Sequence, residues 1–111
     1  MMSIKVNEVN GYTVITVETE RLDVVNMKEM KEAMMEVVDN GYHKVVIDLS
    51  NVTFIDSSGL SVIISLFKRL NALEGELILC GLGEQPKELL EITQLIRLFK
   101  VVETYEEAVR S

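Results

Sequence analysis

The stretch Phe54-Ile55-Asp56-Ser57-Ser58-Gly59-Leu60 decides how this chain folds, because a strand pattern ends and a helix pattern begins within it. Before it, residues 44–50 carry the β-branched run that is typical of a buried strand, and residues 52–55 continue toward the junction. After it, apolar residues recur at helical spacing, namely Leu60, Ile63, Ile64, Phe67 and Leu70. The sequence therefore predicts a strand that runs directly into a helix near Asp56.

The junction has the composition of a helix N-terminus, with Asp56, Ser57 or Ser58 as the capping residue. Such a terminus presents unpaired backbone N–H groups and a partial positive charge, so it accepts an anion such as a phosphate. A phosphoserine placed there would be tolerated by the fold. Asp, Ser and Gly are also favoured at the start of any helix, so spacing alone leaves simple capping and a functional role both open.

The remaining patterns alternate between strands and helices. Residues 4–9 and 12–17 predict two antiparallel strands, because Asn10-Gly11 between them is a strong hairpin signal. Residues 27–38 predict a helix whose methionine stripe is more typical of a core face than of a binding groove. The other predicted elements are a strand at 76–82, a helix from Pro86 through Ile96, a short strand at Val101-Val102, and a last short helix opened by a capping box of Thr104 and Glu107.

Composition indicates one compact domain spanning residues 1–111, with 48% hydrophobic residues and no break in composition. The predicted fold class is α/β, with a mixed sheet that opens with an antiparallel hairpin and carries about four helices. The net charge of -7 disfavours binding to nucleic acid or to anionic membranes. No segment has the length of a signal peptide or a membrane span, which predicts a cytoplasmic protein. Cys80, the only cysteine, lies in an apolar run and is predicted to be buried.

Catalytic motifs are missing from the sequence. It has no Gly-x-Ser-x-Gly elbow, no phosphate-binding glycine loop, and no paired Cys or His set for a metal, so no cofactor is predicted. His43, the only histidine, lies more than about 20 Å from Ser57 along a straight strand, too far to act as its base. A receiver domain with Asp56 as phosphoacceptor would need an acidic pair after the first strand, and residues 7–11 lack one. The chain is therefore predicted not to be an enzyme.

Residues 46–60 resemble the signature of bacterial anti-sigma factor antagonists, the small single-domain members of the STAS family. Further agreement comes from Arg21-Leu22-Asp23 and from residues 75–81, so the resemblance covers nearly the whole chain. Two positions depart from the usual pattern. Glu20 and Ser61 stand where members of the family often have glycine, and Ser61 places another hydroxyl near the acceptor.

The resemblance implies that Ser57 is phosphorylated by a partner that is both anti-sigma factor and serine kinase. Unmodified, the chain would bind this partner and free a sigma factor without touching DNA. The added charge at Ser57 would cause release, and a phosphatase would reset the cycle. The alternative function is a constitutive STAS interaction module in a larger sensory or transport assembly.

Other residues near Ser57 are candidates for partner contact or support of the switch. Asp56 either orients the acceptor hydroxyl, supplies a like charge that rejects the partner, or simply caps the helix. Ser58 and Ser61 are further candidates. Gly59 either permits close backbone approach by the partner or meets the requirement of a turn. Asp23 is a contact implied by the family pattern, or else bonds within its own loop. Val62 and Leu66 fall off the main apolar stripe, so they are candidates to face the partner.

Overall fold

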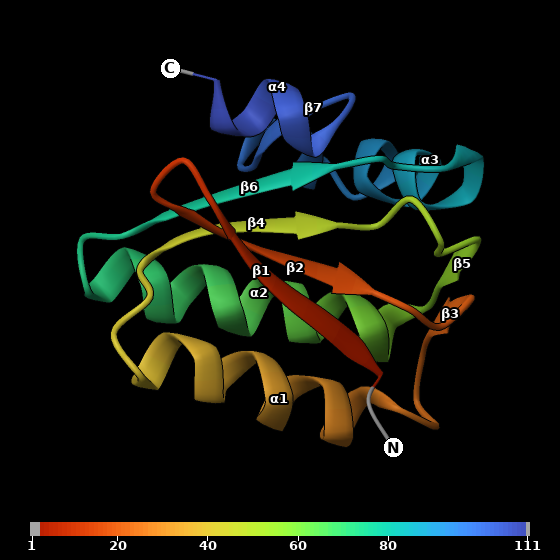
Figure 1. The fold of residues 1–111 in the computed structure, drawn as a ribbon. Coiled ribbons are helices and arrows are strands. Elements are labelled where there is room, and N and C mark those ends of the chain that lie inside the picture. Colours follow the sequence, from red (N-terminus) through yellow and green to blue (C-terminus); the bar gives the residue numbers. More distant parts are fainter. Residues whose placement is uncertain (1–2, 111) are drawn as a thin grey trace.

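The computed structural model describes residues 3–110 and shows the mixed α/β fold that the sequence predicts (Figure 1). Its elements are β1 (Ile4–Val9), β2 (Tyr12–Val17), β3 (Arg21–Leu22), α1 (Met27–Asp39), β4 (Lys44–Asp48), β5 (Phe54–Ile55), α2 (Ser57–Ala72), β6 (Glu76–Cys80), α3 (Glu84–Ile92), the 3-10 turn η1 (Leu95–Arg97), β7 (Lys100–Val102) and α4 (Tyr105–Val109). The strand β3 and the separate 3-10 turn η1 are not anticipated by the sequence analysis.

The main sheet has five strands in the order β1-β2-β4-β6-β7. The hairpin of β1 and β2 is antiparallel, and its turn residues Asn10 and Gly11 both have positive φ, at 54° and 88°. The other neighbouring pairs are parallel, which confirms the mixed sheet. The short strands β3 and β5 form a separate parallel pair, with Leu22 opposite Ile55.

The central strands are buried on both faces, which explains their continuous apolar runs. Val45 and Ile47 of β4 pack into the core beneath α1 and α2, whereas Val46 packs into a smaller cluster with residues of α4. Figure 1 shows α1 and α2 together on one side of the sheet and α4 on the other. Thr104 caps α4 as predicted, since its Oγ1 accepts a hydrogen bond from the Glu107 N–H at 3.2 Å.

Both long helices contribute to the main core cluster, together with the strands of the sheet. Met30, Met34 and Val38 of α1 are fully buried, so the methionine stripe is a core face. In α2, Val62 and Leu66 are only 1% exposed, so the expectation that they could face a partner is wrong. Because α2 packs against α1, the sheet and the β3-β5 pair, it buries more of its circumference than one stripe.

The third helix is shorter than predicted. It begins at Glu84, before Pro86, and ends at Ile92 instead of continuing to Ile96. Gln94 takes a left-handed conformation with φ of 67°, and a single 3-10 turn follows. Beyond this break Phe99 packs edge-to-face on Phe67, with 5.3 Å between the ring centroids. Among residues 3–110, no helix is long and apolar enough to cross a membrane.

The thiol of Cys80 should not react with thiol reagents while the protein is folded. Its side chain is fully buried at the end of β6, and burial, together with the nearby Asp48, raises the pKa of the thiol to about 12. Because the thiolate is the reactive form, native protein at pH 8 should not react with Ellman's reagent, whereas protein unfolded in guanidinium should react with one equivalent. Rapid labelling of the native protein would show that the end of β6 opens in solution.

Candidate functional site

Ser57 is the first residue of α2 and its side chain is exposed, as a kinase substrate requires. The strand β5 ends only one residue before Asp56, so the chain turns from strand to helix with no loop between them. Ser58, the second residue of α2, is half-buried. Of the two adjacent serines, Ser57 is therefore the more exposed residue.

Asp56 caps α2, and its carboxylate bonds to two separate segments. Oδ1 accepts a hydrogen bond from the Gly59 N–H at 2.8 Å, and Oδ2 accepts one from the Val24 N–H at 3.2 Å. The first bond satisfies a free donor of the helix N-terminus. The second joins the start of α2 to the loop that precedes α1. Of the roles considered for Asp56, capping is the one confirmed by these contacts.

The side chain of Asp23 holds the loop between β3 and α1 in shape by bonding to residues on either side of it in the sequence. Its Oδ2 lies 3.0 Å from Arg21 Nε, and its Oδ1 accepts a hydrogen bond from the Val25 N–H at 3.0 Å. Asp23 is a buried residue, only 7% exposed, but the bond from Arg21, helped by the backbone bond from Val25, outweighs this burial and lowers the pKa of its carboxyl. Asn26 completes the loop, because its Oδ1 accepts from the Asp23 N–H and its Nδ2 donates to the Arg21 carbonyl.

This bonding leaves two valines at the surface of the loop. Val24 is 65% exposed and Val25 is 88% exposed, although both are apolar. The hydrogen bond to Asp56 holds Val24 beside the start of α2. The sequence analysis missed them. Their signal is an apolar pair between a strand and a helix that belongs to neither periodic pattern.

Gly59 brings β3 against α2. A Cβ atom at this position would lie 1.9 Å from the Leu22 carbonyl oxygen, so only glycine fits. The space beside Gly59 is therefore occupied by Leu22 of the same chain, and not left open for the close approach of a partner that the sequence analysis expected. Ser61 is half-buried, and its hydroxyl donates to the Ser58 carbonyl at 2.6 Å, within the helix.

A glutamine that the sequence analysis did not identify holds β5 in place beside α3. The side-chain amide of Gln85, on α3, makes a two-way contact with the backbone of Ile55. Its Oε1 accepts from the Ile55 N–H at 2.8 Å, and its Nε2 donates to the Ile55 carbonyl at 2.9 Å. The side of β5 that faces away from β3 is thus satisfied by a side chain that imitates a strand.

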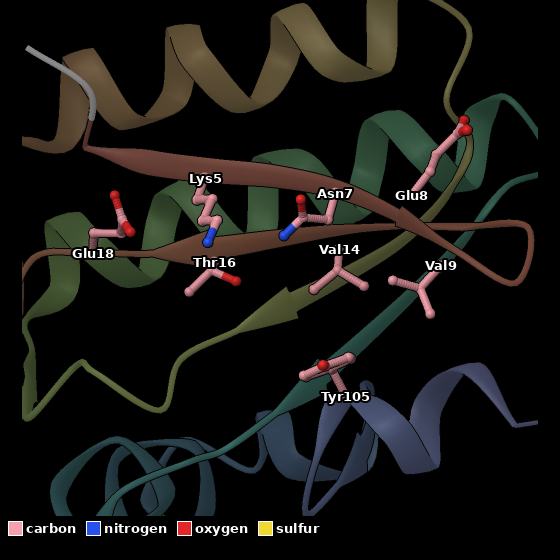
Figure 2. Close-up of a pocket in the computed structure, with 8 residues that line it drawn as sticks. All are labelled: Lys5, Asn7, Glu8, Val9, Val14, Thr16, Glu18 and Tyr105. Atoms are coloured by element: carbon pink, nitrogen blue, oxygen red, sulfur yellow. The ribbon is translucent and has the colours of Figure 1, made fainter.

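The histidine that was considered as a base for Ser57 lies away from the junction of β5 and α2. His43 precedes β4, at the opposite end of that strand from the junction, where its carbonyl accepts from the Glu76 N–H at 2.8 Å. In the part of the chain that the structure describes, no group of three His, Cys, Asp or Glu side chains could hold a metal ion. A hollow of about 530 Å³ lies on the face of the sheet that α4 covers, and Ser57 does not line it. Figure 2 shows its lining residues on the β1-β2 hairpin and Tyr105 of α4.

Comparison with known proteins identifies the family. The model of the STAS domain matches residues 3–108, so this chain belongs to the STAS domain family. The anti-sigma-B factor antagonist of Staphylococcus epidermidis is 34% identical over 85 residues, which are 77% of this chain and 79% of that protein.

Solved structures agree with this assignment. An anti-sigma factor antagonist from Mycobacterium paratuberculosis superposes with a TM-score of 0.85 at 25% identity, covering 96% of this chain and 89% of that one. The Bacillus protein SpoIIAA in its phosphorylated form has the same fold, with a TM-score of 0.73 at 18% identity and 96% of each chain covered.

The contact of Gly59 with Leu22 predicts a strong steric effect. Gly59→Ala should lower the free energy of unfolding by about 2 to 3 kcal/mol, because the new methyl group displaces β3 from α2. Gly83→Ala is the matched control, since its Cβ would meet its nearest neighbour at 3.4 Å, an ordinary contact. Urea unfolding measures both variants, and equal losses would contradict the close packing described here.

Proposed function

We propose that this chain is an anti-sigma factor antagonist: it binds an anti-sigma factor, frees a sigma factor, and is switched off by phosphorylation of Ser57. The observation that carries the proposal is the exposed Ser57 at the start of a firmly capped helix. The names of its relatives support the function. The phosphorylated form of SpoIIAA supports the idea that a domain of this fold can carry a phosphate.

In this proposal the partner is also the serine kinase that modifies Ser57, a phosphatase restores binding, and the chain itself is a substrate and not an enzyme. Asp56 is a poor competing acceptor, because both of its oxygens accept hydrogen bonds from the backbone. The net charge of -7 favours control of transcription through a protein partner over contact with DNA. Such a regulator would act in the cytoplasm, where sigma factors work.

The docking surface in this proposal combines Ser57 with the valine tip, which we define as Val24 and Val25. The tip offers apolar area that the free protein leaves in water. Burying two valines against a partner is worth about 3 kcal/mol, if each contributes about 1.5 kcal/mol. Asp23 supports this surface indirectly, since its bonds to Arg21 and Val25 shape the loop.

Phosphorylation would change charge without refolding the domain. A phosphate adds about -1.5 to -2 charges next to Asp56 at the centre of this surface. The helix N-terminus stabilises the new anion by about 0.3 to 1 kcal/mol, so α2 remains intact. Repulsion and desolvation of about 2 to 4 kcal/mol would weaken docking by roughly thirtyfold to a thousandfold.

Charge at Ser57 should decide partner binding. We expect Ser57→Ala to bind the anti-sigma factor and resist release by ATP, and Ser57→Asp to bind at least tenfold more weakly. Both variants serve as baits in lysate of the source cells, and mass spectrometry identifies what each retains. An ATP-dependent kinase held by the first bait alone is the expected result.

Ser58→Ala and Ser61→Ala are the matched controls, and both should still be phosphorylated by the captured kinase. The label should survive hydroxylamine, which would remove an acyl phosphate from Asp56. Tight binding by Ser57→Asp, with no phosphate on protein taken from cells, would instead indicate a constitutive STAS module.

The valine tip should contribute to docking independently of charge. Val25→Ser should weaken binding of the captured anti-sigma factor about tenfold, because one fully exposed valine is worth about 1.5 kcal/mol when it becomes buried. Ile92→Ser is the matched control, since Ile92 on α3 is 72% exposed and lies outside the docking surface. Calorimetric titration measures both, and unchanged affinity of Val25→Ser would remove the tip from the interface.

A further inference from the structure

The outer edge of β1 is a second surface that could bind a protein segment. The strand lies at one end of the sheet order, and among residues 3–110 no strand pairs with its outer side. At six residues it is twice as long as β7, the strand at the opposite end. Long free edges are templates for a further strand unless something protects them.

The hairpin turn fixes which backbone groups of β1 point outward. A two-residue turn makes its flanking pair, Val9 and Tyr12, a hydrogen-bonded pair, and bonded and non-bonded pairs alternate along an antiparallel ladder. Val6 and Glu8 therefore occupy the non-bonded positions opposite β2. Their N–H and C=O groups point away from the sheet and are free to pair with an added strand.

Beside this edge lies a groove of about 330 Å³ between β1 and α1. Its apolar lining comes from Ile4 and Val6 of β1 and from Ala33 and Val37 of α1. Val6 is 42% exposed, so the groove continues the core outward to the surface. Figure 1 shows that α1 covers one face of the sheet, whereas β1 forms one of its edges.

The rim of the groove is acidic. Glu29, Glu32 and Glu36 line it from α1, and all three are exposed. Ser3 Oγ donates a hydrogen bond to Glu29, but no lysine or arginine within the described residues forms an ion pair with these three carboxylates. Glu32 and Glu36 are separated by about 6 Å along the helix axis, close to the roughly 7 Å between alternate residues of a strand.

We propose that the edge of β1 binds an extended, basic segment of a protein partner by strand addition. The backbone of the segment pairs with Val6 and Glu8. Its alternate side chains, lysine or arginine, point to the α1 side of the sheet and meet Glu32 and Glu36. This surface does not include Ser57, so the inference stands apart from the proposed phosphorylation switch.

Charge argues against a second copy of this chain as the occupant. An antiparallel pair of β1 edges would place both α1 helices on the same face of the joined sheet. The three glutamates of one copy would then face those of the other, and both copies carry a net charge of -7. A basic partner removes this repulsion.

The probe that tests the proposal is the peptide Val-Lys-Val-Lys-Val-Lys-Val, blocked at both ends and titrated into the full chain labelled with ¹⁵N. We expect chemical-shift changes along β1 and at Glu32 and Glu36, and no comparable binding by the peptide with Glu in place of Lys. Shifts confined to other elements, or equal binding of both peptides, would overturn the proposal. So would self-association through β1 in sedimentation experiments.

Variants separate the charge from the backbone contribution. The double variant Glu32→Gln and Glu36→Gln should lower the affinity for the Lys peptide roughly fivefold or more. Glu88→Gln with Glu91→Gln on α3 makes the same change in net charge and should leave binding unchanged. Val6→Pro removes one outward N–H, which an edge strand tolerates, and should also weaken binding. Equal weakening by the two double variants would show that only net charge matters.

Discussion

The carboxylate of Asp56 is the interaction on which the junction depends. With one oxygen it completes the first turn of α2, and with the other it holds a loop that lies 32 residues earlier in the chain. A capping residue normally serves only its own helix. Here the same side chain also fixes where the valine tip lies relative to Ser57, so local helix chemistry determines the shape of a surface built from two separate segments.

Three further contacts keep this geometry rigid. Gly59 allows the Leu22 carbonyl to sit against α2, Gln85 satisfies the free side of β5, and Asp23 bonds within its own loop. Gln85 and Asp23 satisfy backbone groups of Ile55 and Val25, and the room left by Gly59 lets the Leu22 carbonyl accept a hydrogen bond from the Asp56 N–H. A surface that is already ordered loses little conformational entropy on binding, so a change in charge has a direct effect on affinity.

The sequence predicts most of the fold because its elements carry strong local signals. The hairpin at Asn10-Gly11, the stripe of α1 and the junction at Asp56 all depend on patterns within a few residues. The break of α3 at Gln94 was missed because a left-handed glutamine has no such pattern, and the burial of Phe99 beyond it depends on residues far away in the chain. The burial of Val62 was also missed, because one helix cannot show how many neighbours surround it.

The same distinction applies to the site. Ser57 and Asp56 could be found because they adjoin each other at a recognisable helix start. The roles of Arg21 and Gln85 depend on contacts between segments far apart in the chain. The positions of these two residues in the sequence give no indication of those contacts. The family resemblance made Asp23 a candidate site residue, and the structure shows that its side chain bonds to Arg21 and Val25 of its own loop.

The helix α1 connects the two surfaces discussed above. Its N-terminus follows the valine tip, and its acidic side borders the groove beside β1. Because Met30, Met34 and Val38 anchor one continuous helix of 13 residues in the core, the tip and the groove keep a fixed separation. A partner that carried both an apolar pocket for the tip and an extended basic segment would therefore meet a single rigid target. Its second contact would benefit from the high effective concentration created by the first. Phosphorylation at Ser57 would then remove one contact and leave the other, since the glutamates of α1 keep their charge in both states.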